Sequence, residues 1–263
     1  MISTLLFTVI IGLVLGSFLG ALSYRLPRNL NIAKGRSFCP KCKKQIAWYD
    51  NIPLLSYMLL GGKCRNCHKN ISLREPLIEI FTAFVLSTAL IYRQSIVSNL
   101  SWLPENIILQ LVIIFVLAAA LITIFVIDIE QQIIPDSLVF LIFGIVVGNM
   151  ILNGFTPIYD YLTAGFVGSL FLLVVHLLTA GKGMGLGDVK LALALALMLG
   201  PTQSILWYFI SFILGGCVGV FLMLLKNAKM KDKVAFGPFL ILSFFIVAVF
   251  GSELTAIIFP YVF

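Results

Sequence analysis

The feature that most constrains this chain is a series of long apolar runs without charged residues. The first extends over about 2–23, and another covers 107–127. A transmembrane helix needs about 20 consecutive apolar residues. In water-soluble domains about a quarter of the residues are charged, whereas in this chain 11% of the residues are charged and 60% are hydrophobic. The chain is therefore predicted to be a polytopic membrane protein and not a water-soluble globular domain.

The apolar runs are continuous, which indicates helices and not the alternating strands of a membrane barrel. The first run has no basic segment before it and is too long for a leader peptide, so a retained helix is expected. The further runs extend over 76–92, 107–127, 137–152, 161–179, 189–199, 205–225 and 236–259. The predicted fold is an all-α bundle of about eight transmembrane helices, the sixth of them short.

The basic residues are distributed very unevenly among the loops. The chain has 18 Lys and Arg against 11 Asp and Glu. If the N-terminus lies outside, the inward segments are 24–74, 128–136, 180–190 and 226–235, and they hold 17 of the 18 basic residues. Lys and Arg concentrate in cytoplasmic loops. Both termini are therefore predicted to be extracytoplasmic, and the positive charge is attributed to membrane orientation and not to nucleic-acid binding.

The polar segment 24–74 carries two C-x-x-C pairs, Cys39 with Cys42 and Cys64 with Cys67, and 21 residues separate the pairs. Four thiolates with this spacing are typical of a tetrahedral Zn²⁺ site. A pair of disulfides is the alternative, but a cytoplasmic loop lies in a reducing compartment. Because four protein ligands leave no open position, the metal is predicted to be structural. The predicted division of the chain is a first helix at 1–23, a zinc-binding loop domain at 24–74 and a transmembrane bundle at 75–263.

Two other possible metal ligands are given different roles. His68 follows the last cysteine of the cluster and is a weaker alternative ligand than the four thiolates. Cys217 lies beside two glycines in the seventh apolar run, and it is predicted to be buried by helix packing.

Two acidic residues lie at the ends of predicted transmembrane helices, where each costs about 2.5 to 3.5 kcal/mol to insert. Asp128 ends the third helix, and Asp188 opens the sixth in the segment Gly185-Leu186-Gly187-Asp188. Although 60 residues separate them, both fall at the predicted cytoplasmic boundary and can meet. Two carboxylates in contact share a proton, which is the acid–base pair of an aspartic protease.

Each of these acidic residues also has a purely structural interpretation. Asp128 can be an interfacial residue at a helix end, and Asp188 can be an N-cap. Asp136, after a proline, is predicted to be the N-cap of the fourth helix. Glu75 and Glu79 lie on one helix face, where acidic residues stabilise the helix start. Glu79, one turn deeper, can instead bind a cationic group.

Seven segments spread over nearly the whole chain carry a recognisable pattern: Ser37–Cys42, Trp48–Tyr57, Gly62–Cys67, Arg74–Glu79, Asp128–Asp136, Gly185–Lys190 and Phe236–Phe239. They resemble the motifs of the bifunctional type IV prepilin peptidases, which are membrane aspartyl enzymes of the Gly-x-Gly-Asp type. The resemblance implies cleavage of the basic leader of prepilins or pseudopilins after a Gly, at the cytoplasmic face of the bacterial inner membrane. It also implies methylation of the new N-terminal residue, usually Phe, with S-adenosylmethionine as methyl donor.

The resemblance makes Asp128 and Asp188 the catalytic pair, with Gly185 and Gly187 shaping the turn between them. It associates the cysteine loop with methyl transfer. No glycine-rich nucleotide-binding motif is present, so the methyl-donor site stays open, with Glu79 and the segment 50–56 as weak candidates. A peptidase without methyltransferase activity, in which the zinc loop is only structural, is the alternative. The oligomeric state and the choice among pilin-like substrates stay open as well.

Two other classes of function compete with this interpretation. A transporter or channel would carry polar residues at mid-span on several helices, whereas the acidic residues here lie near predicted helix ends. A noncatalytic membrane scaffold built on the zinc loop would tolerate the loss of Asp128 or Asp188, whereas a peptidase would not.

Overall fold

The described part of the chain forms helices joined by turns and loops. The computed structural model describes residues 2–31, 37–181, 183–226 and 235–258. No β-strand occurs among them, and the predicted all-α fold is confirmed. Six of the basic residues assigned above to inward segments lie outside the described residues: Lys34, Arg36, Lys182, Lys229, Lys231 and Lys233.

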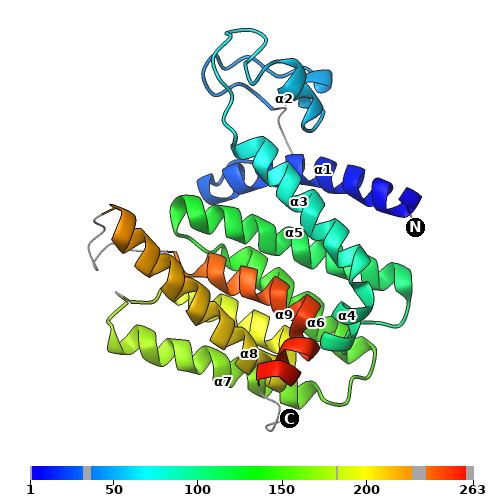
Figure 1. Ribbon diagram of the computed structural model, residues 1–263, viewed down its shortest axis with the longest axis vertical. Helices are drawn as coiled ribbons and strands as arrows, with labels where there is room; N and C mark the ends of the chain where they lie inside the picture. Colours follow the sequence, from blue (N-terminus) through cyan, green and yellow to red (C-terminus); the bar gives the residue numbers. More distant parts are fainter. Residues whose placement is uncertain (1, 32–36, 182, 227–234, 259–263) are drawn as a thin grey trace. The chain divides into compact units, whose positions relative to one another are not determined.

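The helices (Figure 1) are α1 (Ile2–Arg25), α2 (Leu55–Leu59), α3 (Arg74–Ile91), α4 (Arg93–Asn99), α5 (Ile107–Gln131), α6 (Asp136–Leu152), α7 (Ile158–Leu178), α8 (Leu186–Lys226) and α9 (Gly237–Ile258), with the 3₁₀ turns η1 (Leu26–Arg28) and η2 (Trp48–Asn51).

Five of the described helices are long and apolar enough to cross a membrane: α1, α5, α7, α8 and α9. A sixth span is counted if α3 and α4, which bend by 78° at their junction, act as one. α6 is apolar but has only 17 residues. The eight predicted apolar runs lie mostly within described helices, but the sixth and seventh are joined in α8, and five or six candidate spans replace the eight predicted transmembrane helices. The structure therefore agrees with a polytopic membrane protein.

The join within α8 contains a break at Gly200, whose φ of 73° is outside the helical range. Pro201 follows, and proline removes a backbone donor and bends a helix. Side chains bind carbonyl groups near the break: Trp102 Nε1 donates to the Met198 carbonyl at 2.8 Å, and Ser204 Oγ donates to the Ala196 carbonyl at 3.0 Å. The break is thus a bend between two apolar segments that side-chain hydrogen bonds hold in place.

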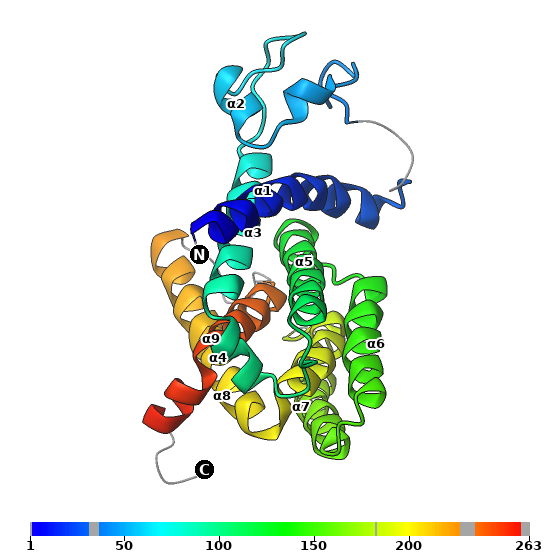
Figure 2. The ribbon, with the colours of Figure 1, turned by 90° about the vertical axis from the view of Figure 1, so that its right-hand side faces the viewer.

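The chain divides into two compact units, each with its own packing. The first combines Met1–Ile91 with Ile114–Ile127. In it α1 and α3 lie side by side (Figures 1 and 2). A Cβ atom added at Gly12 would lie 2.5 Å from the Ala83 Cα atom, and one at Gly16 would lie 2.5 Å from the Glu79 Cα atom. The two helices therefore run antiparallel, and glycines allow their backbones to approach closely.

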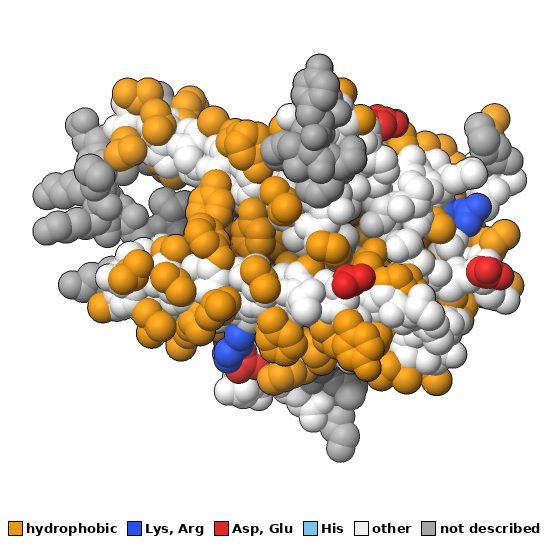
Figure 3. Space-filling view, turned by 90° about the horizontal axis from the view of Figure 1, so that it is seen from below, with side chains coloured by type: hydrophobic (Ala, Val, Ile, Leu, Met, Phe, Trp, Pro, Cys, Tyr) orange, Lys and Arg blue, Asp and Glu red, His pale blue; other side chains and the backbone are white. Residues whose placement is uncertain are grey.

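The second unit combines Tyr92–Ile113 with Asp128–Phe263. α8 packs against α7, α9 and α6, and α4 packs against α9. Trp207 on α8 is fully buried and donates its Nε1–H to the Leu240 carbonyl on α9 at 2.8 Å. Hydrophobic side chains dominate the molecular face in Figure 3, with few charged ones, as expected of a surface in contact with lipid.

The prediction for Cys217 is wrong, because the structure leaves this side chain exposed. The neighbouring Gly216 has no atom within 4 Å of an added Cβ among the described residues. The second half of α8 therefore presents this face outward, and glycines beside a cysteine do not by themselves indicate a packed interface.

Candidate active site and metal centre

Asp128 lies in the last turn of α5 and is 4% exposed. The helix ends three residues later, at Gln131, because Gln132 adopts a left-handed conformation with φ of 55° and donates its amide to the Asp128 carbonyl at 2.9 Å. The Asp128 Oδ2 atom is buried without a hydrogen-bond partner among the described residues. A buried carboxylate oxygen with no donor is costly, so this position favours a carboxyl group that holds or exchanges a proton.

Asp188 lies in the first turn of α8 and is 8% exposed. Its Oδ2 accepts the backbone N–H of Gly185 at 3.1 Å, as an acidic residue at the third helical position does in a capping box. The capping interpretation is therefore correct in part, and the cap also fixes the direction of the carboxylate. A Cβ atom at Gly185 would lie 3.2 Å from this same oxygen, and one at Gly187 would lie 3.0 Å from the Ile134 Cβ atom. Gly185 thus keeps space beside the Asp188 carboxylate, and Gly187 allows the turn to lie against Ile134.

The two carboxylates lie close enough to interact electrostatically. Both also interact with the backbone N–H of Gly237, the first residue of α9. A Cβ atom at Gly237 would lie 2.5 Å from Asp128 Oδ2, so only glycine allows this approach. The second unit therefore brings together the ends of three helices, α5, α8 and α9, around two buried acidic groups that can share one proton.

No role is predicted for Gly237 from the sequence, although the segment Phe236–Phe239 is one of the seven that carry the family resemblance. A Gly-Pro pair at the start of an apolar run is a helix-start signal, but nothing local indicates which side chain the glycine faces. Asp136 also differs from its prediction. Pro135 occupies the N-cap position of α6, and the Asp136 carboxylate forms an exposed ion pair with Lys190 at 2.8 Å.

The four loop cysteines lie in two turns of the same geometry. The Lys43 amide donates to the Cys39 carbonyl and the His68 amide to the Cys64 carbonyl, both at 2.8 Å. Lys43 and His68 occupy the same position after their C-x-x-C pairs, and both have positive φ, 61° and 55°. Each turn closes with one antiparallel bridge, Phe38 with Gln45 and Lys63 with Asn70. The two turns, each called a knuckle below, are thus local copies 25 positions apart.

The two knuckles bring all four sulfur atoms within 4.8 Å of one another. The Sγ atoms of Cys39 and Cys67 are 3.9 Å apart. A tetrahedron with Zn–S bonds of about 2.3 Å has sulfur–sulfur edges of about 3.8 Å, so the donor set fits this ion in type, number and spacing. His68 is outside the cluster. The predicted grouping of the four cysteines is confirmed.

The protonation preferences of the thiols also suit a shared cation. The amides of Cys42 and, to a smaller extent, Lys41 lower the pKa of Cys39 to about 7. The Lys69 amide lowers the pKa of Cys67 as well, but burial and the three neighbouring thiols outweigh it and raise this pKa to about 11. Four adjacent thiolates need positive charge among them, which a divalent metal ion supplies.

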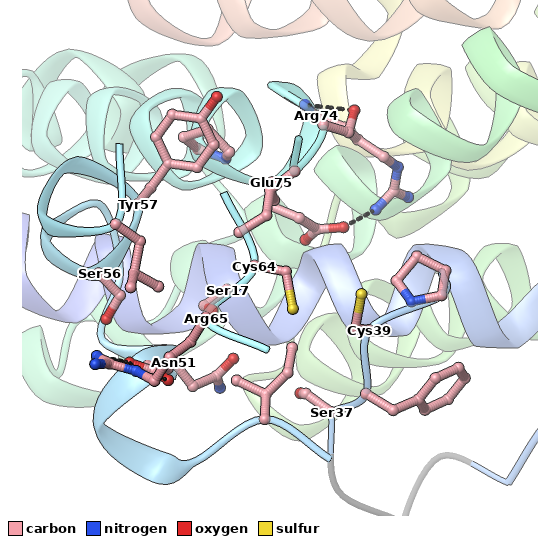
Figure 4. Close-up of a pocket in the computed structure, with 18 of the residues that line it drawn as sticks. Ser17, Ser37, Cys39, Asn51, Ser56, Tyr57, Cys64, Arg65, Arg74 and Glu75 are labelled. Carbon is pink, nitrogen blue, oxygen red and sulfur yellow. Dashed lines mark hydrogen bonds and ion pairs between the residues drawn. The ribbon is translucent and has the colours of Figure 1, made fainter. Parts of the chain in front are cut away.

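A cavity of about 590 Å³ lies between the knuckles and the adjoining ends of α1 and α3 (Figure 4). Its volume is typical of small-molecule sites. The sulfur atoms of Cys39 and Cys64 lie near each other at its wall (Figure 4). The lining includes both sequence candidates for a methyl-donor site, Glu79 and most of the segment 50–56. These residues are distant in sequence, and the fold of the first unit brings them to one cavity.

Glu79 is 6% exposed and lines the cavity. Its Oε2 accepts the backbone N–H of Leu54 at 2.8 Å. Leu54 has φ of 54° and ψ of −47°, an unfavourable conformation for a residue with a side chain. Glu75, by contrast, is partly exposed and pairs with Arg74 at 2.7 Å. The two glutamates therefore differ in environment although they share a helix face.

A second connection ties the loop together. Arg65, inside the second knuckle, binds both carboxylate oxygens of Asp50 at 2.6 to 3.1 Å. Its guanidinium lies 5.5 Å from the centre of the Tyr49 ring. The hydrogen bond from Arg65 holds the pKa of Asp50 below its usual range. The pair links the second knuckle to the segment that lines the cavity.

Comparison with known proteins matches two successive parts of the chain to two families. Residues 10–93 match the family described as the bacterial peptidase A24 N-terminal domain, and residues 115–220 match the type IV leader peptidase family. The prepilin leader peptidase/N-methyltransferase of Aeromonas salmonicida is 31% identical over 275 residues, covering 93% of this chain and 90% of that protein. Proteins of the same name from Pseudomonas aeruginosa and Vibrio cholerae are 30% and 31% identical, covering 94% and 90% of this chain and 91% and 93% of those proteins. No solved structure matches the chain. The chain belongs to the type IV leader peptidase family.

Proposed function

We propose that this protein removes the leader of type IV prepilins or pseudopilins and then methylates the new N-terminus with S-adenosylmethionine. The observation that carries the peptidase activity is the meeting of two buried carboxylates, Asp128 and Asp188, from helices whose acidic residues are 60 positions apart in sequence. The names of the relatives include both activities, which favours a bifunctional enzyme over a peptidase with a purely structural zinc loop.

In the proposed cleavage, Asp128 and Asp188 act on one water molecule and one peptide bond. One carboxylate accepts a proton from water, which attacks the scissile carbonyl carbon, and the other carboxyl donates a proton to the carbonyl oxygen. The carbon–nitrogen bond then breaks, and the leaving amine takes up a proton. Gly185 and Gly237 supply backbone N–H groups that orient the carboxylates, and Gly187 keeps the turn close to Ile134.

The peptidase assignment is tested by Asp128→Asn and Asp188→Asn in the purified zinc-loaded protein. Each change preserves side-chain shape but removes one member of the acid–base pair, so cleavage of a synthetic prepilin should fall by about three orders of magnitude or more. Asp160→Asn, on an exposed residue of α7, is the matched control and should leave cleavage unchanged. Full cleavage by either active-site variant would falsify the assignment.

We place the methyl-transfer site in the cavity beside the zinc knuckles. The donor supplies a methyl group on a positively charged sulfur, and the acceptor is an amine that becomes cationic when protonated. Glu79 is the most buried carboxylate that lines the cavity, and a buried carboxylate attracts cationic groups strongly. Zn²⁺ on Cys39, Cys42, Cys64 and Cys67 would hold the opposite wall without entering the reaction.

The methyl-transfer site is tested by Glu79→Gln. The amide oxygen can still accept the Leu54 N–H, so the change removes the charge and preserves the local bond. Methylation of a cleaved pilin peptide should fall about tenfold or more, whereas cleavage stays at the level of the unmodified protein. Glu75→Gln is the control, because Glu75 already pairs with Arg74 and should affect methylation little. Equal effects of the two variants would contradict a specific role for Glu79.

The membrane arrangement follows from the same proposal. We infer that the loop 24–74 and the two aspartates face the cytoplasm of a bacterial inner membrane, that both termini are extracytoplasmic, and that 1–23, 24–74 and 75–263 act as anchor, methyl-transfer loop and peptidase bundle. The concentration of Lys and Arg in the inward segments supports this orientation. A prepilin presents its basic leader at the same membrane face, so the substrate and the carboxylates would meet there.

A further inference from the structure

The loop between α1 and α3 has an apolar surface that neither proposed reaction uses. Trp48, Leu55, Met58 and Leu59 expose 76%, 51%, 75% and 77% of their surface. They belong to η2 and α2, which pack against each other. We call these four side chains the 48–59 surface. Clustered exposed apolar side chains usually mark a binding surface for protein or membrane.

One polar side chain of this segment, Ser56, points inward and bonds the backbone of the segment itself. Ser56 is only 7% exposed. Its hydroxyl accepts the Ile52 N–H at 3.1 Å and donates to the Tyr49 carbonyl at 2.8 Å. The segment therefore satisfies its backbone internally and presents apolar side chains outward. An element that meets lipid has this arrangement, because lipid offers no hydrogen bonds to backbone groups.

The position of the segment along α1 places it at membrane depth. The Leu54 amide is bound to Glu79, and Glu79 lies against Gly16 of α1. Gly16 precedes Arg25, the basic end of this candidate span, by nine residues, which is about 14 Å along a helix. The polar layer of a bilayer leaflet is only about 5 to 8 Å thick. The Leu54 amide therefore lies no farther from the bilayer centre than the polar layer, and the exposed side chains beside it are within reach of the lipid interface.

We propose that the 48–59 surface inserts into the interfacial layer of the leaflet that faces the loop. Tryptophan is enriched in this layer, where its ring contacts acyl chains and its N–H contacts headgroups. The same loop carries exposed basic side chains that complement anionic headgroups: Lys41, Lys44, Lys63 and Lys69. The loop is thus a membrane-embedded cap on the first unit and not a freely hydrated domain. This inference does not depend on either proposed enzymatic activity.

Tryptophan fluorescence tests the proposal on the full-length, zinc-loaded protein. The other two tryptophans, Trp102 and Trp207, are 1% and 0% exposed. In phosphatidylethanolamine–phosphatidylglycerol liposomes brominated near the headgroup end of the acyl chains, emission should fall by up to about one third relative to unbrominated liposomes, because Trp48 is one of three tryptophans. Trp48→Phe should remove most of this quenching. Quenching of Trp48 by aqueous iodide, with none from brominated lipid, would overturn the proposal.

Photo-crosslinking supplies a second measurement that does not depend on Trp48. A benzoylphenylalanine introduced in place of Met58 should form adducts with phospholipid on illumination. The same group in place of His68, which is exposed on the same loop, is the matched control and should form none. Adducts of the Met58 position with a second copy of the chain or with an added prepilin peptide, in place of lipid, would overturn the proposal. Equal lipid labelling at both positions would overturn it as well.

Discussion

At the scale of single residues, the candidate active site depends on the absence of a side chain at Gly237. Its backbone N–H interacts with both buried carboxylates, and α9 begins there. The first N–H groups of a helix are unpaired and carry partial positive charge. They stabilise negative charge on the pair of aspartates, while the orphaned Asp128 Oδ2 favours a proton. The two tendencies together suit a pair that exchanges one proton.

Gly237→Ala should therefore impair cleavage selectively. The new Cβ atom would lie 2.5 Å from Asp128 Oδ2 and 3.2 Å from the Ile134 Cδ1 atom, so the Asp128 carboxyl must move. A displacement of about 1 Å at a reacting group costs about a hundredfold in rate, and kcat/KM for prepilin cleavage should fall by about that factor. Methylation of a pre-cleaved peptide and zinc content should not change. Gly144→Ala, in open space on α6, should be silent in all three assays.

The residues that sequence analysis could identify are those whose chemistry is conspicuous in their local setting. A carboxylate at a membrane helix end is costly, which pointed to Asp128 and Asp188, and paired C-x-x-C spacing pointed to the four metal ligands. Gly237 has no such signal, because its importance lies in a contact with Asp128, 109 positions away. Cys217 shows the opposite error, since two adjacent glycines suggested that it is packed, whereas only Gly215 faces a neighbouring helix and Cys217 is exposed.

At the scale of helices, the continuous apolar runs were sufficient to predict helix type and approximate extent. It could not predict that the sixth and seventh apolar runs join in α8, because Gly200-Pro201 is equally typical of a loop. The close approach of α1 and α3 was also not predictable. It depends on Gly12 and Gly16 facing Ala83 and Glu79, and one sequence does not show which helices are partners.

The α1–α3 contact predicts a strong effect of small substitutions. In Gly12→Ala and Gly16→Ala, the added methyl group would meet backbone Cα atoms at 2.5 Å, and backbone cannot rotate away as a side chain can. Each variant should lose about 1 to 3 kcal/mol of unfolding free energy, measured by reversible denaturation in detergent. Gly148→Ala, on α6 with no atom within 4 Å of the new Cβ, is the matched control. If all three variants had equal stability, the close packing of α1 on α3 would be contradicted.

At the scale of the whole molecule, the two proposed chemistries belong to different compact units. The zinc knuckles and the cavity are built entirely from residues of the first unit, and both aspartates with Gly237 belong to the second. The leader must be removed before the new N-terminus exists, so a substrate would use the second unit first and the first unit afterwards. Because the two sites belong to different units, a change at one site should abolish one activity and preserve the other, which a single shared site would not allow.

Removal of zinc should therefore abolish methyl transfer and preserve cleavage. Without the ion, the four clustered sulfur atoms either repel one another as thiolates or must be protonated. The folded loop, whose hydrophobic core is small, then loses the metal-binding free energy that stabilises it, about 10 kcal/mol or more. The Glu79–Leu54 bond and the cavity wall should then open, seen as increased hydrogen exchange in residues 38–70. Cys64→Ser should reproduce the effect of a chelator, whereas Cys217→Ser, which removes a thiol outside the cluster, should not. Readdition of Zn²⁺ should restore methylation to the chelated protein. Parallel loss of cleavage and methylation at every chelator concentration would show instead that the peptidase pair depends on the metal, and the assignment of the two activities to separate units would fail.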